Sequence, residues 1–147
     1  MIYEFCAENV TLLEKAMQAG ARRIELCDNL AVGGTTPSYG VTKAAVELAA
    51  NYDTTIMTMI RPRGGDFVYN DMEIAIMLED IRLTAQAESQ GVVFGALTAD
   101  KKLDKPNLEK LIAASKGMEI VFHMAFDELS DDDQLEAIDW LSQAGVT

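Results

Sequence analysis

Residues 23–27 have the sequence Arg-Ile-Glu-Leu-Cys, and a turn-rich loop over 28–40 separates them from a helical apolar pattern over 41–50. A short run with apolar residues at alternate positions is typical of a strand, so this stretch predicts one strand, loop and helix unit. The same order recurs on both sides of it. Predicted strands cover residues 2–6, 54–60, 92–94 and 119–123, and predicted helices cover residues 10–19, 71–90, 106–116 and 131–144.

Strict alternation of strands and helices predicts an α/β fold with a parallel sheet covered by helices, because parallel neighbours need a crossover connection. The sequence contains neither a glycine-rich dinucleotide fingerprint after the first strand nor a P-loop motif. We therefore predict a (β/α)8 TIM barrel, with about five β/α units in this chain. Such a barrel typically needs about 250 residues. We expect residues 1–147 to form one domain that lacks its C-terminal third, with 145–147 turning into a sixth strand.

The composition restricts the class of protein. The chain has 147 residues, with 24 acidic and 12 basic side chains and a net charge of −12. Phosphate-binding surfaces usually carry a basic excess, so we expect no nucleic-acid partner. Two cysteines are too few for a disulfide framework, and the chain has no apolar N-terminal leader. These features predict a cytoplasmic protein with no membrane partner.

The alternation of side chains along each strand predicts what faces the inside of the barrel. Residues two apart share a face. Helices cover the outside and require apolar contacts there, so Ile24 and Leu26 should face outward. The inward face of the first two strands then carries Glu4, Cys6, Glu25 and Cys27. By the same parity, Met57, Met59 and Arg61 share a face, and His123 lies on the side of Val121.

We expect the inward polar residues to lie near the carboxyl ends of their strands, where a barrel carries its chemistry. Buried charges are costly, and clusters of them often mark functional sites. One hypothesis is a catalytic set of Glu4, Glu25, His123 and Asp127, in which Asp127 or Glu25 partners the only histidine in acid–base chemistry. The alternative is structural: Glu25 pairs with Arg61, Glu4 pairs with another base, and His123 is a hydrogen-bonded residue at a strand end.

Two loops carry adjacent glycines, at 33–34 and at 64–65. Such glycines let backbone amides turn toward an anion, and arginine can grip a carboxylate or phosphate with two nitrogens. The second loop therefore predicts a site for a small anionic substrate. Its residues are Arg61, Arg63, Gly64, Gly65 and Asp66. The alternative is that the glycine pairs only form tight turns.

Cys6 and Cys27 occupy equivalent positions on strands that should be neighbours, so their sulfurs are predicted to come within reach of one metal ion. Two thiolates suit a soft ion such as Cu(I), with a methionine as a further ligand. Zinc is less favoured, because a closed zinc site needs four ligands and the chain has one histidine. Alternatively, both cysteines pack as inert buried side chains.

Several motifs resemble the CutC family, whose members are associated with copper homeostasis. The matching stretches are residues 23–27, 33–38, 59–67 with Tyr69, 94–98, and 122–123 with 125–127. This resemblance implies a cytoplasmic, dimeric TIM barrel of a little over two hundred residues with a role in copper handling. Cys6 and Cys27 match the two cysteines proposed to bind copper in the family. Residue 124 is Met where relatives often have Arg, which adds a thioether near the site.

Two functions of different classes thus remain open. The first is a copper homeostasis protein that binds Cu(I) through Cys6 and Cys27. The second is a barrel enzyme in which Arg61 and Arg63 hold a small anionic carboxylate or phosphate while Glu25 or His123 moves a proton. The separation of the two cysteine sulfurs is the observation that best distinguishes them. We also expect a chain of five units to expose a sheet edge and much of its lumen, and therefore to associate or to be unstable. The resemblance to the CutC family implies that the associated form is a homodimer.

Overall fold

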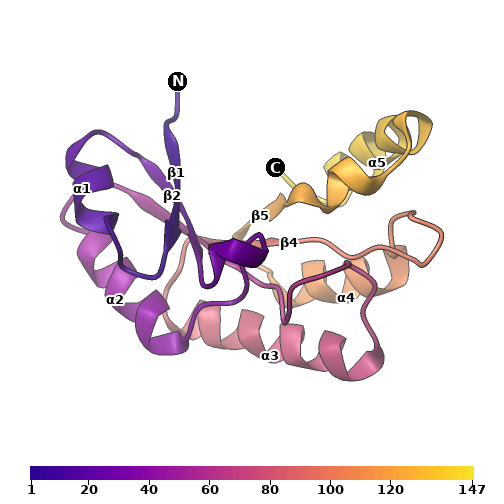
Figure 1. The fold of residues 1–147 in the computed structure, drawn as a ribbon, viewed down its shortest axis with the longest axis horizontal. Helices are drawn as coiled ribbons and strands as arrows, with labels where there is room; N and C mark the ends of the chain where they lie inside the picture. The colour runs from indigo at the N-terminus through magenta and orange to yellow at the C-terminus, as the bar shows by residue number, and fades with distance from the viewer.

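The computed structural model describes residues 1–147 and contains one parallel sheet in the order β1-β2-β3-β4-β5 (Figure 1). Its strands are β1 (Glu4–Glu8), β2 (Arg23–Cys27), β3 (Thr55–Met59), β4 (Gly91–Phe94) and β5 (Glu119–Phe122). Its α-helices are α1 (Leu13–Gln18), α2 (Tyr39–Ala49), α3 (Asp71–Gln86), α4 (Lys105–Ala114) and α5 (Asp131–Gln143). Helices α1 to α4 follow one side of the sheet in an arc, and α5 lies beyond β5 (Figure 1). The α/β prediction is confirmed.

The first unit differs most from its predicted boundaries. The first strand covers Glu4–Glu8 rather than residues 2–6, so its carboxyl end lies two residues further along the chain. Helix α1 begins at Leu13 rather than at residue 10, because Leu12 has a left-handed backbone with φ 58° that no α-helix continues through. At the other end of a longer helix, Glu88 has φ 64°, and α3 stops at Gln86 instead of continuing to residue 90.

The outer face of the sheet forms the main core under the helices. Ile24 and Leu26 are fully buried and belong to a cluster with side chains of α1 and α2, as predicted. Val92 and Phe94 of β4 belong to a second cluster with α3 and α4. Burying an apolar side chain of this size contributes roughly 1.5–3 kcal/mol. Because side chains alternate along a strand, the packing of these residues under the helices determines which side chains face the inner side of the sheet.

The inner face carries a smaller apolar cluster. Its buried members are Cys27, Met57, Met59 and Val93, with Val121 packed against them. This confirms the predicted parity in β2, β3 and β5. The sheet is open, with β1 and β5 at its edges, so the chain is short of a full barrel. At the β5 edge the amide of Thr147 donates to the carbonyl of Ile120 at 2.9 Å.

Side-chain caps define where the loops end and the helices begin. Ser38 caps α2, Asn70 forms a capping box with Glu73 in α3, Asp104 caps α4, and Ser130 caps α5. Each cap satisfies an amide that the first helical turn leaves free. These caps set the residue at which each loop from the carboxyl end of a strand ends and the following helix begins. None of the helices combines the length and the apolar content that crossing a membrane requires.

Candidate functional site

Cys6, Glu25 and Cys27 meet on the inner face of the sheet, at its β1 edge. The parallel register sets Cys6 opposite Glu25, and Glu8 opposite Cys27. The sulfurs of Cys6 and Cys27 lie 3.9 Å apart, and they lie 3.6 and 3.7 Å, respectively, from Glu25 Oε1. The three potential ligand atoms are all within 4.8 Å of one another. The expected approach of the two sulfurs is present. The cysteines are two residues out of register rather than at equivalent positions, and Glu25 joins them.

The three residues differ in exposure but share one electrostatic trend. Cys27 is buried, Glu25 is half-buried, and Cys6 is exposed at the sheet edge. Burial raises the pKa of Cys27, and the neighbouring Cys6 and Glu25 raise it further. Burial, followed by the charge of Glu25, raises the pKa of Cys6. Burial, followed by the charge of Glu4, raises the pKa of Glu25. Without a bound ion, both cysteines are therefore protonated thiols at neutral pH.

The donor set fits a soft metal ion. A bond from a thiolate sulfur to zinc is about 2.3 Å long, so sulfurs 3.9 Å apart accommodate an ion of that size between them. Thiolates select soft ions such as Cu(I). Glu25 offers an oxygen, which Zn²⁺ accepts readily and which is a harder donor than Cu(I) prefers. The two sulfurs of Cys6 and Cys27 are thus the donors suited to copper.

The loop after β2 closes over the buried sulfur. Gly34 has φ +89°, and a Cβ built on it would lie 3.0 Å from Cys27 Sγ. Real Cβ atoms rarely approach another atom so closely, and L residues rarely adopt this backbone conformation. Only glycine therefore lets the loop pass this close to Cys27.

Glu4 lies elsewhere in its strand than the sequence suggested. It is the first residue of β1, at the amino end, because the strand continues to Glu8. Its carboxylate forms an ion pair with Arg23, the residue directly opposite it in β2. The prediction that Glu4 lies near the carboxyl end of its strand is therefore wrong. Its pairing with a base is the structural alternative considered above.

Arg61 connects two loops from inside the molecule. Its guanidinium is buried and donates to the carbonyls of Val32 and Gly34 in the β2–α2 loop, at 2.7 and 2.9 Å. It also donates to the carbonyl of Gly65 in the β3–α3 loop, at 2.8 Å. No ion pair joins Arg61 to Glu25. The Nε atom of Arg61 is buried without a partner, so most of the guanidinium supports the loops.

Arg63 is held within its own loop. It forms ion pairs with Asp66, at 3.0 Å, and with Glu73 at the start of α3. The hydrogen bonds from Arg63 hold the pKa of both carboxyls below their usual range. Arg63 also donates to the carbonyl of Val68 at 2.8 Å. Arg63 and Asp66 therefore satisfy each other, and an anion would have to displace these contacts.

The glycine pairs bring loops together. A Cβ on Gly64 would lie 2.9 Å from the side chain of Val32 in the neighbouring loop. Gly65 has φ +87°, and Gly33 has φ +85° and faces the methyl group of Met124. These glycines permit close packing of three loops, which agrees with the structural alternative. Anion binding by Gly64 and Gly65 stays a prediction.

His123 is buried and neutral. Its Nδ1 accepts from the amide of Ala125 at 3.2 Å, and its Nε2 is buried without a partner. Burial, followed by the positive charge of Arg61, lowers its pKa to about 3. Asp127 is exposed in the short 3-10 helix Met124–Glu128. No hydrogen bond joins His123 to Asp127 or to Glu25, so the expected acid–base pair is not formed.

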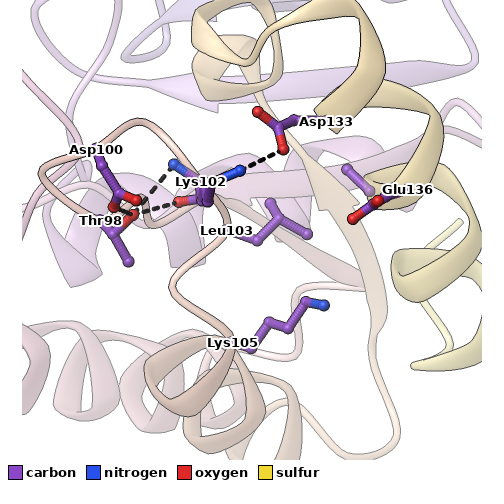
Figure 2. Close-up of a pocket in the computed structure, with 8 residues that line it drawn as sticks. Thr98, Asp100, Lys102, Leu103, Lys105, Asp133 and Glu136 are labelled. Carbon is purple, nitrogen blue, oxygen red and sulfur yellow. Dashed lines mark hydrogen bonds and ion pairs between the residues drawn. The ribbon is translucent and has the colours of Figure 1, made fainter.

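Two cavities lie at the loop between β4 and α4, and no residue of the cysteine cluster lines them. One, of about 540 Å³, includes Gly65, Asp66 and Phe67 in its wall. In the other, of about 310 Å³, Lys102 pairs with Asp133 at 2.7 Å (Figure 2). The second cavity could not be predicted from the sequence, because lysines and acids spread over residues 98–137 resemble an ordinary solvated surface.

Comparison with known sequences assigns the chain to a family. The sequence model of the CutC family matches residues 1–147. The chain belongs to the CutC family. A CutC family protein of Enterococcus faecalis is 53% identical over 147 residues, which are 100% of this chain and 70% of that protein. One of Streptococcus pyogenes is 52% identical over 145 residues, which are 99% of this chain and 69% of that protein.

Solved structures agree with this assignment. A CutC crystal structure from Streptococcus agalactiae, whose description assigns it provisionally to copper homeostasis, matches with TM-score 0.96 and 49% identity. The match covers 100% of this chain and 70% of that one. An oxaloacetate acetylhydrolase matches with TM-score 0.63 at 10% identity, over 99% of this chain and 56% of that one, which is a likeness of fold alone. The predicted family and the TIM-barrel class are confirmed.

Proposed function

We propose that this CutC family chain is a copper homeostasis protein that binds Cu(I) between Cys6 and Cys27. The observation that carries the proposal is the separation of 3.9 Å between the two sulfurs. These residues are far apart in sequence, and only the pairing of β1 with β2 brings them together. The provisional assignment of the Streptococcus agalactiae relative to copper homeostasis supports the same function.

Cu(I) is the cargo in this proposal, and the chain supplies the ligands. Cys6 is exposed and Cys27 is buried behind it, so an ion reaches the site from the side of Cys6. Metal binding requires thiolates, and Glu25 Oε1 already accepts from both thiols. Free thiols persist in a reducing compartment, which supports a cytoplasmic location.

Anaerobic titration with Cu(I) tests the proposal. We expect about one equivalent per chain, and no binding when Cys6→Ser and Cys27→Ser are combined. Cys6→Ser alone should also lose binding, and because Cys6 is exposed this variant leaves the apolar core intact. A Met57→Leu variant is the matched control, since it removes a buried sulfur without removing a thiol. Binding by the double variant equal to that of the native chain would contradict the proposal.

A second candidate is an enzyme that acts on a small carboxylate or phosphate. It is favoured by three buried polar atoms without partners, which are Arg61 Nε, Tyr69 Oη and His123 Nε2. Because His123 Nδ1 accepts a hydrogen bond, its Nε2 carries the proton, and all three atoms offer donors to an anion. In this hypothesis Arg61 holds the anion, and Arg63 joins it once the contacts with Asp66 and Glu73 are displaced. His123 Nε2 donates a hydrogen bond to the anion, and Glu25 moves a proton.

Ligand-dependent thermal unfolding tests the enzyme hypothesis. Inorganic phosphate and small dicarboxylates should raise the Tm of the native chain, since a ligand that binds only the folded state stabilises it. His123→Asn should reduce that rise. Asparagine keeps an acceptor for the amide of Ala125, so the loop is preserved. If none of these anions changes the Tm, the hypothesis is wrong.

A further inference from the structure

Two buried methionines stand beside the cysteine cluster on the inner face of the sheet. Glu25 of β2 is paired with Met57 of β3, and Leu26 with Thr58. The next residues along these parallel strands are Cys27 and Met59, which therefore lie side by side in the register. Met57 and Met59 are both fully buried, and both belong to the apolar cluster that contains Cys27.

The two methionine side chains end in different places. Met57 fills the space over Gly91, where an added Cβ would overlap its methyl carbon and lie 2.5 Å from its sulfur. Gly91 belongs to β4, on the far side of β3 from the cysteines. Met59 instead ends beneath Gly34, where a Cβ would lie 3.6 Å from its methyl carbon and 3.0 Å from Cys27 Sγ. The end of Met59 and the sulfur of Cys27 thus lie under the same backbone position.

We propose that Met59 supplies a third sulfur to Cu(I) held by Cys6 and Cys27, and that it makes the site selective for Cu(I) over Zn²⁺. This inference rests on the proposed function of the cysteine pair. Methionine has three rotatable bonds and adapts to irregular space, so its thioether turns toward the ion without moving β3. Met59 is then a ligand, whereas Met57 contributes packing only.

Charge and softness favour Met59 over Glu25 as the third donor. A thioether is soft and neutral, and soft sulfur donors select Cu(I). A carboxylate is hard, and it would add a second excess negative charge to a Cu(I) ion already bound by two thiolates. Unbalanced charge is costly at a partly buried site. Zn²⁺ carries one more positive charge and accepts oxygen donors, so Glu25 serves Zn²⁺ better and Met59 serves Cu(I) better.

The test compares Met59→Leu with the matched control Met57→Leu. Both variants replace a buried methionine sulfur on one face of β3 by a side chain of similar volume. Cu(I) affinity is measured anaerobically by competition with a chromophoric chelator, and Zn²⁺ affinity by the same approach. We expect Met59→Leu to weaken Cu(I) binding by about tenfold and to leave Zn²⁺ binding unchanged. Met57→Leu should change neither, and unfolding in urea checks that both variants fold.

X-ray absorption at the copper edge gives a second readout, with three sulfur neighbours expected in the native chain and two in Met59→Leu. Equal Cu(I) affinity and equal sulfur counts in the native chain and Met59→Leu would overturn the role of Met59 while leaving the cysteine site standing. Equal weakening by both methionine variants would also overturn it, because that result indicates packing. If Cys6→Ser with Cys27→Ser binds Cu(I) like the native chain, the proposed function itself fails.

Discussion

The backbone of Gly34 lies directly over the sulfur of Cys27. A Cβ at Gly34 would be 3.0 Å from Cys27 Sγ, and its φ of +89° is one that glycine alone adopts at little cost. The loop can therefore pass this close to the sulfur only because Gly34 has no side chain.

Gly34→Ala should weaken Cu(I) binding and lower stability, because the new methyl group displaces Cys27 Sγ. Gly117→Ala is the matched control: it has φ +92°, and a Cβ there would have no neighbour within 4 Å. Both substitutions carry the cost of a left-handed backbone, about 1–2 kcal/mol. Only Gly34→Ala should lower the free energy of unfolding in urea by more than this cost, and only Gly34→Ala should change the Cu(I) affinity. Equal losses in the two variants would contradict the close approach.

The stability of the chain should depend on pH through His123. Burial, followed by the charge of Arg61, lowers its pKa from 6.5 to about 3 in the folded state. The unfolded chain therefore binds the proton more readily between these values, and the stability present above pH 6.5 is lost as pH falls toward 3. The slope is about 1.4 kcal/mol per pH unit.

His123→Asn removes this titration while keeping an acceptor for the amide of Ala125. Between pH 7 and pH 5.5, urea unfolding should show the native chain losing about 1–2 kcal/mol more than the variant. The comparison with the variant cancels the titration of the carboxyl groups, which both proteins share. A difference between the two proteins that stays constant over this range would show that His123 is not buried in its neutral form.

Arg61 should contribute to stability through the shape of its guanidinium. Arg61→Lys keeps the charge, but its single ammonium nitrogen replaces two separated nitrogens, Nη1 that donates to Val32 and Gly34 and Nη2 that donates to Gly65. We expect a loss of about 3 kcal/mol, because buried carbonyls lose charged partners. The control is Arg63→Lys, whose side chain is partly exposed, with ion pairs near the surface, and whose loss should be smaller. A larger loss for Arg63→Lys would contradict the role assigned to Arg61.

The 147-residue chain should associate in solution. The outer edges of β1 and β5 lack partner strands, and Leu135 and Ile138 of α5 have exposures of 68% and 53%. Exposed strand edges and apolar patches promote association. Light scattering coupled to size exclusion should give a mass above 16.1 kDa. Leu135→Glu should shift the mass toward that of the monomer, whereas Met72→Glu on α3 should not. A stable native monomer would refute this prediction.

The sheet and its inward residues could be predicted because they depend on local sequence. Alternation in residues 23–27 placed Ile24 and Leu26 under the helices and Cys27 inside, as observed. The start of α1 could not be predicted, because Leu12 adopts a left-handed backbone that its side chain disfavours. The position of Glu4 within its strand could not be predicted either, because the apolar pattern did not show that β1 continues to Glu8.

The sequence by itself determined the fold class, the family resemblance and the facing of the two cysteines, since strand period and residue order are properties of the chain alone. Only the tertiary structure decided which groups became partners. Glu25 accepts hydrogen bonds from the thiols of Cys6 and Cys27 and forms no ion pair with Arg61. Arg61 instead donates to backbone carbonyls, including that of Gly34. These choices depend on strand register and on loops from distant parts of the chain. A polar group that folding buries takes whichever partner those loops bring within hydrogen-bonding distance.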